Sequence, residues 1–282
     1  MLPGEAHVGH SGIELRREVK VNFNSIVFAV DSDIARLTLN CPDKLNSFNV
    51  EMHTEVRRAL DSLPGSGARV LILTGAGRGF CAGQDLSDRA VAPGGEGADL
   101  GASIEKYYAP LVLTLQSLPL PVIAAVNGVA AGAGANIALA CDVVIAAKSA
   151  SFVQAFCKLG LIPDSGGTWI LPRLVGSARA MGLSLLGEKL PAEQAAAWGL
   201  IWQCVDDAEL APTVDRLALH FARAPTLGLA CTKRALLGSG QRSLAQQLDV
   251  ERDLQRELGR SHDYAEGVAA FIDKRPPKFQ GR

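Results

Sequence analysis

The chain has 282 residues, of which 48% are hydrophobic, enough to bury a sizeable core in one large domain or in one domain with an appendage. Its formal net charge of −1 excludes a general attraction to nucleic acid or to an anionic membrane. Any binding of a polyanionic ligand must therefore come from local lysines and arginines.

The cysteines and histidines do not form a disulfide or metal pattern. The six cysteines lie among apolar neighbours without C-x-x-C spacing, which indicates buried, reduced thiols. His7 and His10 lie in a polar segment, and His53 shares a charged helix face with Glu51 and Glu55, so histidines are expected at the surface. No signal peptide or membrane-spanning run is evident, and we expect a soluble, cytoplasmic protein without nucleic-acid or membrane partners.

The N-terminal third predicts a tail, a hairpin and a helix. Residues 1–22 mix charges and glycines without periodicity and are expected to be a flexible tail. The apolar runs Ile26–Val30 and Ala35–Asn40, with the polar residues Asp31-Ser32-Asp33 between them, predict a hairpin. Asn49 is expected to cap a helix, because Met52, Val56, Ala59, Leu60 and Leu63 follow it at helical spacing.

The middle of the chain alternates strands with helices. Strands are predicted at Val70–Leu73, Val122–Val126 and Val143–Ala147, with a helix from Ser103 to about Leu118 and a short helix ending near Ala140. This order looks like a repeated ββα unit, although the spacing alone equally allows an ordinary parallel α/β sheet.

Beyond Asp206 the pattern becomes helical throughout. Four amphipathic segments are separated by proline or glycine: Leu210–Ala224, Thr226–Leu237, Ser243–Leu258 and Asp263–Lys274. These helices either pack against the rest of the same chain or form a surface that associates with another copy of the chain.

Two junctions rich in small residues, Arg78–Leu86 and Asn127–Asn136, each follow a predicted buried strand. Small side chains let a ligand approach the main chain, and a helix N-terminus offers unpaired N–H donors. Two such junctions facing each other would aim two amides at one oxygen, an oxyanion hole that suggests acyl or thioester chemistry. The alternative is that both are tight turns of an ordinary α/β core.

Further motifs extend the pattern: Cys41–Phe48, Pro121–Gly128, Cys141-Asp142 and Leu161–Thr168. Together with the two junctions they resemble the crotonase (enoyl-CoA hydratase/isomerase) superfamily from Ile26 to the C-terminus. The resemblance implies an α/β fold, with a crotonase spiral of ββα repeats over residues 23–205. It also implies a helical C-terminal region over 206–282 that assembles a homotrimer or a dimer of trimers.

The same resemblance implies the catalytic groups. The oxyanion donors should be the amides of Gln84 and Ala133, although Ala133 interrupts the commoner run of three glycines. The two water-handling glutamates of family hydratases match Asn136 and Phe156, and neither side chain can act as a base. Two-glutamate hydration is therefore not expected.

The remaining acid/base candidate is Asp164, which matches the carboxylate of several isomerases and dehalogenases of the superfamily. The alternative is that Asp164 caps a helix beginning around Ser165. Asp142 is the second candidate, but a carboxylate at a helix-to-strand junction typically accepts backbone hydrogen bonds. Phe156 and Trp169 are expected to line an apolar pocket beside Asp164.

The resemblance further implies an acyl-CoA thioester as substrate, with no separate cofactor and no metal, since coenzyme A belongs to the substrate. The substrate-binding residues it indicates are Lys44, Leu45, Ala82, Asp85, Leu86, Gly132, Phe156, Phe271 and Lys274. Lys44 would contact phosphate, and Phe271 and Lys274 would reach the nucleotide, possibly from a neighbouring subunit. The Ser87–Gly101 loop is a candidate lid.

Three segments, Leu45–Asn49, Gly75–Leu86 and Lys158–Trp169, are most similar to the isomerases of aerobic phenylacetate degradation. They imply isomerisation of a coenzyme A thioester. Δ3,Δ2-enoyl-CoA isomerisation, enoyl-CoA hydration and a non-enzymatic acyl-CoA-binding role remain alternatives.

Overall fold

The computed structural model describes residues 23–89 and 99–282. The predicted flexible tail and the centre of the candidate lid lie outside these residues. The strands are β1 (Ile26–Asp31), β2 (Ile34–Leu39), β3 (Val70–Gly75), β4 (Gly79–Cys81), β5 (Val122–Val126), β6 (Val129–Ala131), β7 (Val143–Ala147), β8 (Ser151–Val153), β9 (Lys189–Pro191) and β10 (Gln203–Val205).

The helices begin and end close to the predicted segments in most places. They are α1 (Val50–Asp61), α2 (Leu100–Ser103), α3 (Ala109–Ser117), α4 (Ala133–Leu139), α5 (Gly167–Leu186), α6 (Ala192–Ala197), α7 (Leu210–Arg223), α8 (Thr226–Ser239), α9 (Leu244–Leu258) and α10 (His262–Ile272). In the described ranges, no helix combines the length and the apolar character needed to cross a bilayer.

The strands form two sheets, one of six strands in the order β1-β2-β3-β5-β7-β10 and one of four in the order β4-β6-β8-β9. Successive strands are shared between the sheets, because β3, β5 and β7 join the larger sheet while β4, β6 and β8 join the smaller one. Helical segments follow each pair. The predicted spiral of ββα repeats is therefore confirmed, and the ordinary parallel sheet is excluded.

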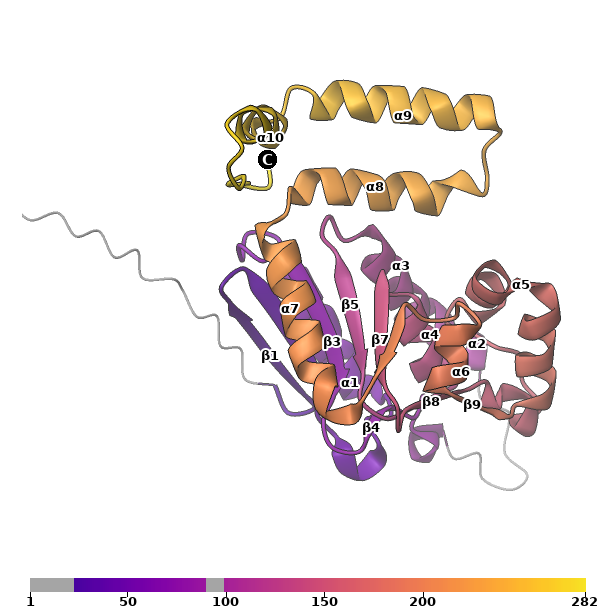
Figure 1. Ribbon diagram of the computed structural model, residues 1–282. Coiled ribbons are helices and arrows are strands. Elements are labelled where there is room, and N and C mark those ends of the chain that lie inside the picture. Colours follow the sequence, from indigo (N-terminus) through magenta and orange to yellow (C-terminus); the bar gives the residue numbers. More distant parts are fainter. Residues whose placement is uncertain (1–22, 90–98) are drawn as a thin grey trace, which may run out of the picture.

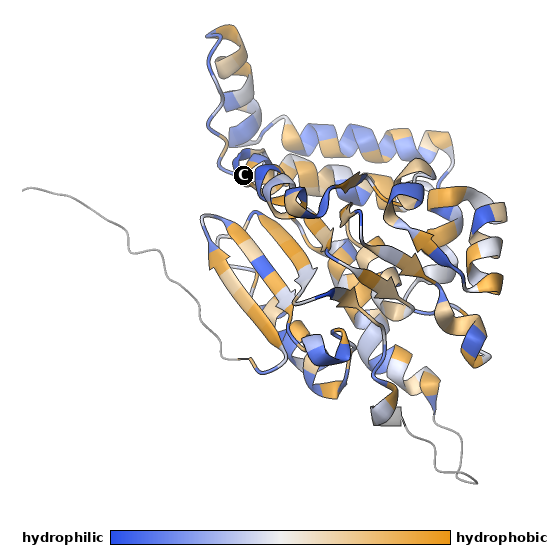
Figure 2. Ribbon diagram, turned by 60° about the horizontal axis from the view of Figure 1, so that its bottom comes forward, coloured by the Kyte–Doolittle hydropathy of each residue, from blue (hydrophilic) through white to orange (hydrophobic). Residues whose placement is uncertain are grey.

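The two central strands of the larger sheet, β3 and β5, are apolar because they are buried. The residues of β5 are all buried, and so is all of β3 except Thr74, as expected for parallel strands covered on both faces. Helix α7 packs across β3, β5 and β7 (Figure 1). The strands are mostly coloured as hydrophobic in Figure 2.

The N-terminal predictions are confirmed in detail. Strands β1 and β2 pair antiparallel, with Ile26 opposite Leu39. The Asn49 side chain accepts a hydrogen bond of 2.8 Å from the Met52 amide, so Asn49 caps α1.

The predicted helix from Ser103 to Leu118 is present as part of a continuous helical segment, but it contains a π-helical turn over Ile104–Tyr108 between α2 and α3. Pro110 lies in the first turn of α3 and has no N–H to donate to the carbonyl of Lys106 four residues earlier. That carbonyl accepts a bond of 3.0 Å from Arg57 of α1 instead. A contact distant in sequence thus stabilises the irregular turn.

The expectation that His53 lies at the surface is wrong. Its side chain is buried, with the Tyr107 ring stacked at 5.0 Å and the Tyr108 ring edge-on at 4.5 Å. Glu55 is buried as well and accepts bonds of 2.8 Å from the amides of Asn24 and Ser25. Burial opposes its ionisation, but these hydrogen bonds hold the pKa of Glu55 below its ordinary value.

Beyond α7 the chain leaves the sheets. Helices α8 and α9 form an antiparallel hairpin above the sheets, and α10 follows at one end of it (Figure 1). The hairpin is attached to the body by Lys233 of α8, whose Nζ lies 2.8 Å from Asp142 Oδ2 and 2.7 Å from the Leu115 carbonyl oxygen.

Candidate active site

The first glycine junction is held by Phe48. The Phe48 amide donates to the Gly83 carbonyl at 2.7 Å, and the Asp85 amide donates to the Phe48 carbonyl at 2.8 Å. Phe48 and Gln84 form a parallel β-bridge, in which the hydrogen bonds of Phe48 go to Gly83 and Asp85, the residues on either side of Gln84. The N–H of Gln84 itself takes no part in this bridge. The Gln84 side chain is fixed separately, because its Oε1 accepts a bond of 2.8 Å from the Tyr108 hydroxyl.

The second junction places Ala133 at the first position of α4. Gly132 precedes it as N-cap with φ of 53° and ψ of −125°, a conformation open to glycine. Ala133 itself is helical and is not among the residues with positive φ, so its methyl group causes no backbone strain. Its N–H belongs to the group of amides that a helix start leaves without an intrahelical partner.

The two junctions pack main chain against main chain. A Cβ atom added to Gly83 would lie 2.9 Å from the Ala131 carbonyl oxygen and 3.5 Å from the Ala133 nitrogen. A Cβ on Gly134 would lie 2.3 Å from the Cys81 carbonyl oxygen. The amides of Gln84 and Ala133 therefore come from two loops in direct contact.

Phe156 lies beside the same loop. A Cβ atom on Gly132 would be 3.6 Å from the tip of its ring, and the ring itself is buried. Phe156 thus places an apolar ring beside Gly132.

Asp164 begins a tight turn that leads into α5. Ser165 and Gly166 both have positive φ, of 50° and 82°, and the Gly167 amide donates to the Asp164 carbonyl at 2.8 Å. Two consecutive positive φ angles with this bond define a type I′ turn. The Asp164 carboxylate accepts a bond of 2.8 Å from the Ser165 hydroxyl.

The alternative that Asp164 caps the next helix is wrong. Helix α5 starts at Gly167, its N-cap is Gly166, and no side chain caps it. The two left-handed residues after Asp164 place the start of the helix at Gly167, two residues beyond the expected Ser165, so the half-buried Asp164 precedes the N-cap.

Two buried amides adjoin this turn. Asn136 Nδ2 donates to the Asp164 carbonyl at 2.8 Å, and Asn136 Oδ1 accepts a bond of 2.8 Å from Gln154 Nε2. Sequence reasoning identified Asn136 only as a missing glutamate. It missed Gln154, since nothing in its local sequence points to a partner in α4.

Asp142 is engaged elsewhere. Its Oδ2 accepts a bond of 2.8 Å from the Val122 amide and forms the ion pair with Lys233. Burial raises the pKa of the Asp142 carboxyl despite that lysine. These contacts connect β5 and α8, which is the structural role typical of a carboxylate at such a junction.

The expected coenzyme A residues of the first junction lie together. Lys44 Nζ is 2.5 Å from Asp85 Oδ2, and Ser87 donates its amide and hydroxyl to Asp85 Oδ1 at 3.0 and 2.6 Å. The lysine and Ser87 lower the pKa of Asp85 to about 2. The Leu45 carbonyl oxygen accepts a hydrogen bond of 2.9 Å from the Ala82 amide. Leu86 exposes 59% of its surface.

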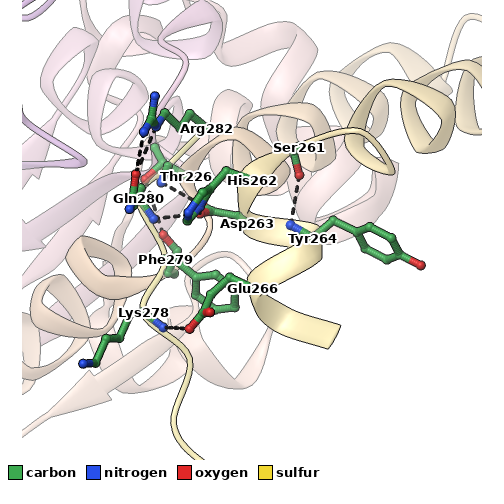
Figure 3. Close-up of polar contacts among 12 residues, drawn as sticks. Thr226, Ser261, His262, Asp263, Tyr264, Glu266, Lys278, Phe279, Gln280 and Arg282 are labelled. Carbon is green, nitrogen blue, oxygen red and sulfur yellow. Dashed lines mark hydrogen bonds and ion pairs between the residues drawn. The ribbon is translucent and has the colours of Figure 1, made fainter. Parts of the chain in front are cut away.

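The C-terminal candidates lie at the end of α10, where the chain turns and its last residues fold back along the helix as a C-terminal tail. Asp263 accepts the amides of Gln280 and Gly281 at 2.7 Å each, and Glu266 accepts the Lys278 amide at 2.6 Å (Figure 3). Phe271 remains 86% exposed, and Lys274 adopts a left-handed φ of 53°.

The tail is also attached to the body through Arg69. Its guanidinium donates to the carbonyls of Ala224 and Phe279 and to the Thr226 hydroxyl. Figure 1 shows α10 and β4 at opposite ends of the fold. Within one chain, Phe271 and Lys274 are therefore not brought to the Gln84 junction.

Trp169 lies at the edge of a separate cavity. It lines a cavity of about 590 Å³ between α5, α8 and the body, together with Asp142, Arg173 and Lys233. The Arg173 guanidinium lies 3.9 Å from the centre of its ring. Neither Asp164 nor the two junction amides line this cavity. The predicted apolar pocket of Phe156 and Trp169 around Asp164 therefore stays a prediction, and the contact that the structure gives Trp169 is with the cavity beside α8.

The profile of the Enoyl-CoA hydratase/isomerase family matches residues 29–282. The chain belongs to this family. It is 58% identical over 258 residues to the 1,2-epoxyphenylacetyl-CoA isomerase of Escherichia coli, covering 91% of this chain and 98% of the relative. A probable enoyl-CoA hydratase of Rhodobacter capsulatus is 48% identical, covering 93% and 100%. The crystal structure of an enoyl-CoA hydratase from Bacillus anthracis superposes with a TM-score of 0.86 at 32% identity, covering 92% and 100%.

Proposed function

We propose that the protein is an isomerase of coenzyme A thioesters that converts 2-(1,2-epoxy-1,2-dihydrophenyl)acetyl-CoA into its oxepin form in phenylacetate catabolism. The 58% identity to an E. coli enzyme of that name over nearly its whole length supports the reaction. Within the fold, the proposal is supported by the contact between Asn136 Nδ2 and the Asp164 carbonyl, which brings that carboxylate-bearing turn next to a position where, by the resemblance, hydratases carry a glutamate.

The chemistry follows from the two junctions. A thioester carbonyl between the amides of Gln84 and Ala133 would have its developing enolate oxygen stabilised by two donors, without a buried cation. Asp164 would take the α-proton and return it to the substrate. Coenzyme A is carried by the substrate, so the reaction needs no separate cofactor.

Δ3,Δ2-enoyl-CoA isomerisation is the second candidate function. Moving one proton between two carbons needs one carboxylate, and Asp164 could serve both reactions. Hydration by the two-glutamate mechanism is disfavoured, because Asn136 and Phe156 cannot activate water.

The assembly we propose is a homotrimer or a dimer of trimers. Phe271 and Ile272 at the end of α10 expose 86% and 71% of their surfaces, and Leu236 of α8 exposes 68%. Large apolar side chains that stay exposed on the C-terminal helices are typical of surfaces covered by another chain. Phe271 and Lys274 would then reach coenzyme A bound to a neighbouring subunit.

The test is the substitution Asp164→Asn, assayed by ultraviolet absorbance on both the epoxide and an unsaturated thioester. Asparagine keeps an acceptor for the Ser165 hydroxyl, so the fold should be retained. Double-bond isomerisation should fall by about 100- to 10,000-fold, the usual contribution of a positioned acid/base group. The epoxide reaction has no net proton transfer, so its decrease should be smaller.

The matched control is Asp142→Asn, the same change at the carboxylate that joins β5 to α8. It should lower the melting temperature and leave the rate per folded molecule unchanged. Near-wild-type rates of Asp164→Asn on both substrates would remove Asp164 from the mechanism, and an inactive Asp142→Asn would then assign the role to Asp142.

A further inference from the structure

We propose that Asn136 and Gln154 are positioning residues, which hold the Asp164 turn in place through a buried chain of two amide hydrogen bonds. The inference rests on the proposed role of Asp164. It gives a new task to the position that carries a water-handling glutamate in hydratases.

The chain of bonds links three elements of the core. Gln154 directly follows β8, Asn136 lies in α4, and Asp164 precedes α5. Gln154 Nε2 donates to Asn136 Oδ1, and Asn136 Nδ2 donates to the Asp164 carbonyl, each at 2.8 Å. Asn136 is fully buried and Gln154 is 3% exposed, so water does not compete for these bonds. A turn held by a strand end and a helix is defined more tightly than a loop in solvent.

The turn needs such support, because Ser165 is strained. A residue with a side chain is rarely stable at positive φ, and such conformations persist where the surroundings over-determine them. The Asp164 carbonyl accepts two donors, the Gly167 amide within the turn and Asn136 from outside it. The Ser165 hydroxyl then bonds to the Asp164 carboxylate, so a rotation of the turn would also rotate the carboxylate.

The side chain at position 136 must be a donor of limited length. An ionised glutamate or aspartate has only acceptors and would face the Asp164 carbonyl oxygen without a proton between them. Space is restricted too, since a Cβ atom on Gly167 would lie 2.3 Å from Asn136 Nδ2. Asparagine meets both requirements.

Gln154 adds a second sign of a specific role. Its Oε1 is buried and has no hydrogen-bond partner among the described residues. An unpaired buried amide oxygen is unfavourable, and an apolar side chain of similar volume would avoid it. What the glutamine provides in return is the bond that fixes the orientation of the Asn136 amide.

The experiment measures kcat and KM of double-bond isomerisation, with the melting temperature, for Asn136→Asp and Gln154→Leu. A misplacement of about 1 Å at a reacting group lowers the rate by about 100-fold. We therefore expect kcat to fall by about 10- to 100-fold in Asn136→Asp and by about 3- to 10-fold in Gln154→Leu, with KM within about threefold of wild type. If Asn136→Asp does not fold, Gln154→Leu carries the test.

The control is Glu55→Gln, another isosteric change of a buried side chain that bonds main-chain amides. It should lower the melting temperature and leave kcat unchanged. If Asn136→Asp and Gln154→Leu behave like this control, the two amides support only the fold and the inference is overturned, while the role of Asp164 stands.

A double variant distinguishes positioning from an independent contribution. With Asp164→Asn already present there is no carboxylate to position, so adding Asn136→Asp should lower the rate no further. A further decrease equal to that of the single variant would show that Asn136 acts elsewhere and would overturn the inference. If Asp164→Asn alone keeps the wild-type rate, the proposed function fails together with this inference.

Discussion

The ion pair between Lys233 and Asp142 predicts how firmly the C-terminal helices are attached to the sheets. Lys233→Met removes an ammonium group whose side chain is 9% exposed and which also bonds the carbonyls of Leu115 and Leu120. Breaking a buried pair from one side typically destabilises a protein by about 3–5 kcal/mol, because the remaining charge loses its partner. Asp142 keeps the Val122 amide and is 22% exposed, so we expect a value near the lower limit, about 3 kcal/mol.

The assay is thermal unfolding of Lys233→Met and of Lys233→Met with Asp142→Asn. A loss of about 3 kcal/mol corresponds to a decrease of about 6–12 °C in melting temperature for a chain of this size. Adding Asp142→Asn should recover at least half of this loss, because asparagine still accepts the hydrogen bond from the Val122 amide and carries no charge.

The pH dependence gives an independent check. Burial raises the pKa of Asp142 in the folded state, and loss of the lysine raises it further. The folded state then binds more protons than the unfolded one, so the destabilisation should shrink as the pH falls from 8 to 5. If Lys233→Met lowers the free energy of unfolding by less than about 0.5 kcal/mol, the usual range of surface changes, the reasoning is refuted. It is also refuted if adding Asp142→Asn leaves the destabilisation unaltered.

Four further outcomes are expected. Asp85 has a pKa of about 2 in the fold, so its ionised form stabilises the protein above about pH 4 and the effect is lost as the pH falls through 2; Lys44→Met should move this loss toward pH 4, and acid unfolding curves that coincide would contradict it. Gly134→Ala should destabilise the protein by about 1–3 kcal/mol and abolish isomerisation, because the new Cβ would lie 2.3 Å from the Cys81 carbonyl; unchanged unfolding and rate would argue against the packed junctions. Light scattering should show a trimer or hexamer of the 29.7 kDa chain, and a monomer alone would exclude the proposed role of the neighbouring subunit. Crotonyl-CoA should be hydrated far more slowly than an unsaturated thioester is isomerised; hydration at the usual enzyme turnover of about 1–1,000 per second would contradict the isomerase.

Local patterns predicted the regular parts of the fold correctly. The hairpin of β1 and β2 and the Asn49 cap depend on residues close together in the sequence, and both are confirmed. The π-helical turn before α3 could not be predicted in this way. It depends on Arg57 of α1 reaching the carbonyl of Lys106, which is 49 residues away.

The same distinction between local and distant contacts holds for the candidate site. The contact between the two junctions follows from glycines that the sequence displays, since a side chain at Gly83 or Gly134 would prevent it. The surroundings of Asp164 were predicted less well. The local sequence allowed a helix cap, but two left-handed residues rule it out, and the amide that holds the turn comes from Asn136, 28 residues earlier.

Arg69 bears on the order in which the protein can mature. It is fixed early in the chain, next to β3, yet its bond to the Phe279 carbonyl joins residues 210 positions apart. Because Arg69 is synthesised long before Phe279, the sheets can form before this acceptor exists. The contacts between Arg69 and the segment around Phe279 can therefore form only after those among the strands, which are complete earlier in synthesis.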